Sequence, residues 1–138
     1  MDANRDGEMD ILLVDDHVPI RHEMRQLIEA ETDLNVAGET NNGREAVQFV
    51  RDHRPDLILM DILMPGMNGI EASKAILADF PKTRILVLSN LGGRNLVRLV
   101  LDLGACGYVR KDRAVEELTE ALETICRGDQ YLGEGLTD

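Results

Sequence analysis

The stretch Leu57-Ile58-Leu59-Met60-Asp61 decides the fold of this chain, because four apolar residues run directly into an acid. A second stretch has the same form, since Ile11-Leu12-Leu13-Val14 is followed by Asp15 and Asp16. Unbroken apolar runs of this length are typical of parallel strands that are buried on both faces. In open sheets of such strands, ligands bind at the carboxyl ends. The sequence therefore predicts an acidic site where these two strands end.

Strand-like runs alternate with segments of helical periodicity along the whole chain. We predict strands near residues 11–14, 34–38, 57–60, 85–88 and 106–109, and helices near residues 18–30, 43–52, 69–78, 94–103 and 114–127. This alternation predicts an α/β fold, a doubly wound five-stranded parallel sheet with helices on both faces. The expected strand order is the flavodoxin-like 2-1-3-4-5, in which the first and third strands are neighbours. Asp15, Asp16 and Asp61 should then lie side by side.

The length of 138 residues suits a single domain. We predict an N-terminal arm over residues 1–9, one folded domain over residues 10–128, and the start of a linker over residues 129–138. The linker prediction rests on the stretch Gln130-Tyr131-Leu132-Gly133-Glu134-Gly135, which carries turn-forming residues. We expect no further strand or helix after Gly128.

Charge and composition argue against nucleic-acid and membrane binding. The formal net charge is -11, and aromatic residues make up 3% of the chain. Duplex binding needs a basic surface and single-strand binding needs aromatic platforms, so we expect no direct contact with nucleic acid. No apolar run approaches the roughly 20 residues that span a bilayer, and residues 1–10 lack the apolar core of a signal peptide. We therefore expect a cytoplasmic protein that does not bind membranes.

Two more polar residues, Ser89 and Lys111, end predicted strands at the same edge of the sheet. Carboxylates that converge there would repel each other by roughly 4 kcal/mol per pair at about 4 Å, with an effective dielectric near 20. Mg²⁺ prefers oxygen ligands and relieves such repulsion. A carboxylate nucleophile, a metal, a hydroxyl and a lysine are together what phosphoryl transfer to a carboxylate requires. The residues alone therefore predict phosphoryl chemistry on Asp61.

These motifs jointly resemble the receiver domain of two-component response regulators. The resemblance spans about residues 9–127 and is carried by Asp15-Asp16, by residues 60–69 (Met-Asp-Ile-Leu-Met-Pro-Gly-Met-Asn-Gly), by Ser89 and by residues 104–112 (Gly-Ala-Cys-Gly-Tyr-Val-Arg-Lys-Asp). Asp16-His17 and Lys111-Asp112 are similar to the NarL/FixJ group of LuxR-type transcriptional regulators. In that group a linker and a DNA-binding domain usually follow the receiver, so the resemblance implies an output through a domain outside this chain.

The resemblance also implies a role for each residue of the acidic cluster. Asp61 would accept the phosphoryl group. Asp16 would bind Mg²⁺ directly, Asp15 would bind it through water, and the backbone carbonyl of Leu63 would complete the protein ligands. A sensor histidine kinase or a small phosphodonor would supply the phosphoryl group. The protein would catalyse only its own phosphorylation and dephosphorylation and would not be a turnover enzyme.

The remaining implied roles concern the switch. Lys111 would pair with the phosphoryl group, Ser89 would move toward it, and Tyr108 would follow by swinging inward. The predicted helix over residues 94–103 is more apolar than a free surface helix needs. Close packing on the sheet and contact with a partner, such as a homodimer formed on phosphorylation, both remain open.

Two apolar residues near the predicted site bear on how long a phosphoryl group would last, and two alternative functions remain. Leu63 and Leu91 lie two residues past Asp61 and Ser89, and neither side chain can orient an attacking water, so we expect slow self-dephosphorylation. One alternative is a stand-alone receiver that acts by protein contact. A haloacid-dehalogenase-like phosphohydrolase is a weaker alternative, because it needs a general acid where this chain has Leu63.

Overall fold

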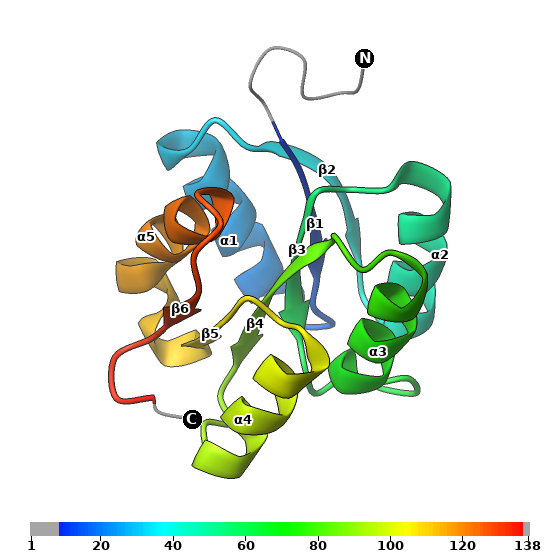
Figure 1. Cartoon of the computed structure of the whole chain (residues 1–138). Helices are drawn as coiled ribbons and strands as arrows, with labels where there is room; N and C mark the ends of the chain where they lie inside the picture. The colour runs from blue at the N-terminus through cyan, green and yellow to red at the C-terminus, as the bar shows by residue number, and fades with distance from the viewer. Residues whose placement is uncertain (1–8, 137–138) are drawn as a thin grey trace.

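A parallel sheet of six strands forms the centre of the domain, as a computed structural model of residues 9–136 shows (Figure 1). The strand order is β2-β1-β3-β4-β5-β6. Helices α1 and α5 cover one face of the sheet, and α2, α3 and α4 cover the other. The strands are β1 (Asp10–Val14), β2 (Asn35–Thr40), β3 (Leu57–Asp61), β4 (Arg84–Ser89), β5 (Gly107–Arg110) and β6 (Tyr131–Leu132). The helices are α1 (Val18–Glu31), α2 (Gly43–His53), α3 (Gly69–Asp79), α4 (Arg94–Leu103) and α5 (Ala114–Cys126), with a 3-10 turn, η1 (Lys111–Arg113), before α5.

The sixth strand corrects the sequence prediction. The order 2-1-3-4-5 is right for the first five strands, but the expectation of no further element after Gly128 is wrong, because β6 pairs in parallel with β5. A strand of two residues carries no periodicity that a sequence could reveal. Its pairing is decided by the free edge that β5 offers in space. The predicted N-terminal arm lies outside the described residues except for Met9, whose carbonyl oxygen accepts a hydrogen bond from Asn35 N (2.8 Å).

The unbroken apolar runs are explained by two cores, one on each face of the sheet. Successive side chains of a strand point to opposite faces, so each run feeds both cores. Leu12 and Val14 pack with α2, α3 and α4, whereas Ile11 and Leu13 pack with α1 and α5. The residues of β3 divide in the same way. A strand with only one buried face would instead alternate apolar and polar residues.

Local signals place the helix ends within one or two residues of the predictions. Asn42 and Asn68 cap α2 and α3 by accepting hydrogen bonds from Glu45 N and Glu71 N, each at 2.8 Å. Such caps satisfy backbone donors that the first helical turn leaves free. In α4, Val97 and Val100 are buried, while Leu99 faces solvent, so the sheet accounts for only part of its apolar surface. Within residues 9–136, no helix is both long and apolar enough to cross a membrane.

The turn from β3 into α3 brings two backbone segments into close contact at Gly69. A Cβ atom at this position would overlap the carbonyl oxygen of Asp61, and Gly69 N donates to Ile62 O at 2.8 Å. Only glycine permits such an approach of backbone to backbone. The approach fixes the path of the chain immediately after Asp61, where the site lies.

We expect Gly69→Ala to lower the free energy of unfolding by roughly 3 kcal/mol, at the upper end of the cost of overpacking. Gly93→Ala is the matched control, because no atom lies within 4 Å of a Cβ built there. Its effect should stay below about 1 kcal/mol, since lost chain entropy and a weaker helix cap oppose each other. Urea denaturation measures both, and equal effects of the two substitutions would contradict the close approach.

Candidate functional site

The carboxyl ends of four neighbouring strands bring the predicted site residues together. Asp15 follows β1 directly, Asp61 and Ser89 are the last residues of β3 and β4, and Lys111 follows β5. One carboxylate oxygen from each of Asp15, Asp16 and Asp61 lies within 4.8 Å of the others. This placement confirms the prediction that the three acids are neighbours. Asp15 and Asp61 are buried, with 4% and 2% exposure, whereas Asp16 faces solvent.

A single lysine serves both buried acids. Lys111 Nζ lies 3.0 Å from Asp15 Oδ2 and 3.2 Å from Asp61 Oδ1. One ammonium group cannot neutralise two carboxylates, so a negative charge remains at the site. Asp61 Oδ2 is also buried without a hydrogen-bond partner among residues 9–136. A carboxylate oxygen in this state is suited to bind a cation or to attack an electrophile.

The electrostatic balance of the site opposes ionisation of Asp61. Burial of the carboxyl raises the pKa of Asp61 to about 6, and the negative charge of Asp15 acts in the same direction. Lys111 offsets part of this increase in pKa. The donor set consists of carboxylate oxygens without a thiolate, which fits a hard cation such as Mg²⁺. Added positive charge would lower the pKa of Asp61 and favour the ionised form.

Backbone contacts hold Asp15 in place. Asp15 Oδ1 accepts a hydrogen bond from His17 N at 2.8 Å, and Asp15 N donates to Thr40 O at 3.1 Å. The guanidinium of Arg21 donates to the carbonyl oxygen of Asp15 at 2.6 Å. Three different segments therefore orient the residue that faces Lys111. The imidazole of His17 is exposed and contributes no atom to the acidic cluster.

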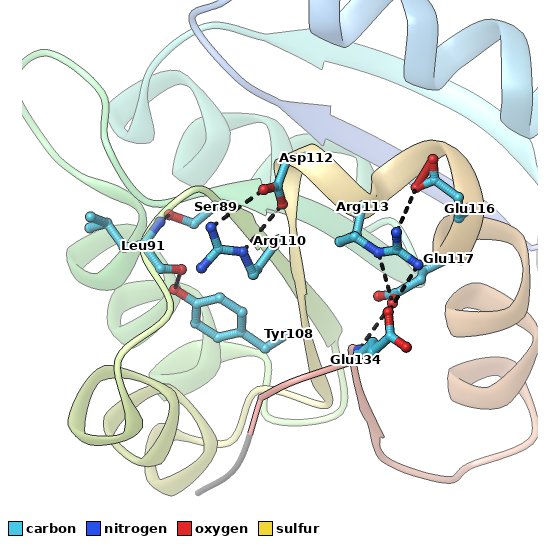
Figure 2. A network of polar contacts seen from close by, with 9 residues as sticks. All are labelled: Ser89, Leu91, Tyr108, Arg110, Asp112, Arg113, Glu116, Glu117 and Glu134. Atoms are coloured by element: carbon cyan, nitrogen blue, oxygen red, sulfur yellow. Dashed lines mark hydrogen bonds and ion pairs between the residues drawn. The ribbon is translucent and has the colours of Figure 1, made fainter.

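Ser89 and Tyr108 are connected through the backbone of Leu91 (Figure 2). Leu91 N donates to Ser89 Oγ at 3.1 Å, and the Tyr108 hydroxyl donates to Leu91 O at 2.6 Å. Tyr108 is fully buried, and burial raises the pKa of its hydroxyl. The ring therefore points inward in this structure, and the movement expected of Tyr108 on phosphorylation stays a prediction.

The chain matches the family model described as the response regulator receiver domain over residues 11–123. It belongs to the receiver domain family. It is 39% identical over 127 residues to the nitrate/nitrite response regulator protein NarL of Escherichia coli strain K12, covering 92% of this chain and 59% of that protein. The similarity to NarL, together with the similarity to a LuxR-family response regulator of known structure, confirms the expected NarL/FixJ group. Response regulators of this group typically control transcription.

Solved structures give the same result for the fold. A LuxR-family two-component response regulator from Aurantimonas sp. SI85-9A1 is 35% identical, with a TM-score of 0.85 and coverage of 90% of this chain and 89% of that one. The non-phosphorylated receiver domain of the stress response regulator RcsB from Escherichia coli is 28% identical, with a TM-score of 0.86 and coverage of 92% and 99%. The chain spans between 54% and 60% of the length of the curated relatives it matches. Receiver domains are generally signalling modules and not turnover enzymes.

Leu63 and Leu91 both lie in loops at the receiver site, but only the role of Leu63 was indicated by the sequence. Leu63, which the sequence indicated as a ligand through its backbone carbonyl, lies in the loop after β3 and is 59% exposed. The bridging role of Leu91 was missed, because it is carried by backbone N–H and carbonyl groups that every residue possesses. No residue type signals such a role, so only the tertiary contact with Tyr108 identifies it.

We expect Asp61→Asn to raise the free energy of unfolding of the metal-free receiver by about 1–2 kcal/mol near pH 7.5. The folded-state pKa of Asp61, about 6, lies above the unfolded value of 3.8, so the folded wild type binds the additional proton and loses stability as pH rises through this window. Solvent at the open edge of the site screens part of the full effect.

Urea denaturation in EDTA, repeated down to about pH 4, measures the difference between the two proteins, which should vanish at the acid end. Asp102→Asn, on the exposed surface of α4, removes an equal charge and should not show this dependence. A pH-independent difference for Asp61→Asn would contradict the raised pKa.

Proposed function

We propose that Asp61 accepts a phosphoryl group and thereby switches this receiver between two conformations. The observation that carries the proposal is the buried, unpartnered Oδ2 of Asp61, held beside the ammonium group of Lys111. In the reaction this oxygen attacks phosphorus, and the bond from phosphorus to the donor breaks. The leaving group, a histidine imidazole or acetate, takes the bonding electron pair. Lys111 stabilises the negative charge of the transferred group.

Mg²⁺ would be held by the oxygens of the acidic cluster. Asp16 and Asp61 would bind the ion directly, Asp15 would bind it through water, and the backbone carbonyl of Leu63 would complete the protein ligands. The ion supplies positive charge that neutralises the acids and the incoming phosphate. The exposure of Asp16 supports this assignment, because it leaves the open side of the cluster accessible to a hydrated ion.

The switch would run through Leu91. If the Ser89 hydroxyl turns to donate to a phosphoryl oxygen, it gives up the hydrogen bond from Leu91 N. The loop that contains Leu91 would then move. Leu91 O accepts the hydrogen bond of the Tyr108 hydroxyl, so this movement would also shift Tyr108. A change at Asp61 thus reaches a fully buried ring on β5 through two hydrogen bonds.

The proposed donor is a sensor histidine kinase, with small phosphodonors such as acetyl phosphate as substitutes. The proposed output is control of transcription through a DNA-binding domain, with a homodimer of receivers formed on phosphorylation. The relatives in the NarL/FixJ group support the output. The net charge of -11 supports the view that this chain does not itself contact DNA.

Incubation with acetyl phosphate and Mg²⁺ should add one phosphoryl group, about 80 Da by intact mass, consistent with modification of one side chain. EDTA should abolish the gain, and so should Asp61→Asn, because both remove part of the reacting cluster. Asp102→Asn is the charge-matched control and should be modified like the wild type. Modification of Asp61→Asn to the same extent would place the phosphoryl group elsewhere.

The aspartyl phosphate should be lost slowly. The exposed apolar side chains of Leu63 and Leu91, 59% and 40% exposed, flank the site and cannot hydrogen-bond an attacking water. Leu63→Asn supplies a polar group there and should shorten the lifetime several-fold, whereas Leu99→Asn on α4 should not. The decay of the mass adduct after removal of the donor gives each lifetime. A wild-type lifetime on the order of seconds would refute the expectation of slow loss.

A further inference from the structure

The segment over residues 131–136, here called the C-terminal segment, lies along the free edge of β5 (Figures 1 and 2). Tyr131 N donates to Cys106 O at 3.1 Å, and Gly133 N donates to Tyr108 O at 2.9 Å. Backbone pairing alone over two residues is too short to hold a strand in place. Side chains must therefore contribute to docking.

The first anchor of the C-terminal segment is Glu117, on the first turn of α5 (Figure 2). Its side chain is buried, and its Oε2 accepts a hydrogen bond from Glu134 N at 3.0 Å. A Cβ atom on Gly133 would lie 2.5 Å from Glu117 Oε1, so the backbone passes directly over the carboxylate. Arg113 completes the anchor, with its guanidinium 3.1 Å from Glu134 Oε1 and 3.7 Å from Glu117 Oε2.

The second anchor is Leu136, which is 8% exposed. It belongs to the same apolar cluster as Tyr108. A Cβ atom on Gly92 would lie 3.2 Å from Leu136 Cδ2, so Leu136 also covers the loop between β4 and α4. This loop contains Leu91, the residue that connects Ser89 with Tyr108.

Each anchor has its own short connection to the acidic site. The Tyr108 hydroxyl donates to Leu91 O, and its backbone carbonyl accepts from Gly133 N, so one residue touches both the loop that contains Leu91 and the C-terminal segment. In η1, Lys111 contacts Asp15 and Asp61, and Arg113, two residues later, contacts Glu134. Both connections pass through residues 108–113.

Docking of the segment is also poised to reverse. Glu117 Oε1 is buried without a hydrogen-bond partner among the described residues, and such an unmade bond opposes docking. Backbone pairing over two residues adds little stability to the docked segment, and the unmade hydrogen bond of Glu117 Oε1 opposes docking. Small shifts of the two anchors can therefore release the segment.

We propose that the C-terminal segment is a latch, docked by Glu117 and Leu136 when Asp61 is unmodified and released when Asp61 is phosphorylated. The trigger rests on the proposed function of Asp61. Movement of the Leu91 loop takes away the surface under Leu136, and movement of Lys111 shifts Arg113 in the same turn. The phosphorylation state of Asp61 is thereby passed to the C-terminal segment.

Hydrogen exchange with mass spectrometry tests the latch on the full chain, with and without acetyl phosphate and Mg²⁺. Peptides that cover residues 131–136 should exchange at least about fivefold faster after phosphorylation, the lower end of coupling between linked sites. The intact mass of the same sample reports the adduct. No adduct would contradict the proposed function of Asp61, whereas a complete adduct with unchanged exchange at the segment would overturn the latch.

Two substitutions test the anchors directly. Glu117→Met keeps the length of the side chain but removes the acceptor, and Leu136→Ala removes the apolar contact. Both should speed exchange of the segment without phosphorylation, while peptides of β1 and β3 stay protected, which shows that the fold is intact. Glu116→Met, an exposed acid in the same helical turn, and Leu99→Ala, an exposed leucine on α4, are the matched controls.

Reciprocity gives the decisive result. If occupation of the phosphoryl site releases the segment, release must strengthen reversible binding at that site by the same factor. The anchor variants should therefore bind the phosphomimetic BeF3- with Mg²⁺ more tightly at equilibrium than the wild type does, and the controls should match the wild type. Variants that free the segment but leave this affinity unchanged would overturn the coupling.

Discussion

Two buried carboxylates share one ammonium group at the carboxyl edge of the sheet, and the rest of the structure depends on this unequal pairing. Asp15 and Asp61 meet because β1 and β3 are adjacent, and Lys111 reaches both from the end of β5. The lysine keeps the acids together, but it leaves one negative charge and one free oxygen on Asp61. Burial raises the pKa of that carboxyl to about 6, so added positive charge would stabilise its ionised form. An arrangement optimised for stability alone would not leave such a charge unpaired.

The acidic site is connected to the rest of the domain mainly through β5 and the turn that follows it. The Tyr108 hydroxyl on β5 donates a hydrogen bond to the carbonyl oxygen of Leu91, and Lys111 in η1 contacts the acids directly. The same strand and turn also hold the C-terminal segment through Gly133 and Arg113. These contacts involve residues only a few positions apart, which is the basis for the proposed coupling between the site and the segment. Contacts of residues 108–113 thus lie between Asp61 and the C-terminal segment.

Sequence reasoning succeeded where a residue type has one dominant physical use. The apolar runs before Asp15 and Asp61 predicted strands that are buried on both faces, and the two cores of the sheet confirm this. Lys111 was placed at the site because its strand had to end at the same edge as the acids. Sequence reasoning failed at β6, where two residues carry no pattern. It also failed at Leu91, whose backbone N–H and carbonyl groups make the contacts while its side chain does not.

The sequence by itself determined the parallel sheet, the order of its first five strands and the cluster of acids at their ends. These follow from hydrophobic burial and from the alternation of strands and helices, both of which are written in the order of residue types. The tertiary structure decided which oxygens of Asp61 and Asp15 the single lysine reaches, that Tyr108 lies inward, and that the C-terminal segment docks on β5. Each of these depends on distances between groups far apart in the chain, and such distances are set only once the strands have paired and the helices have packed.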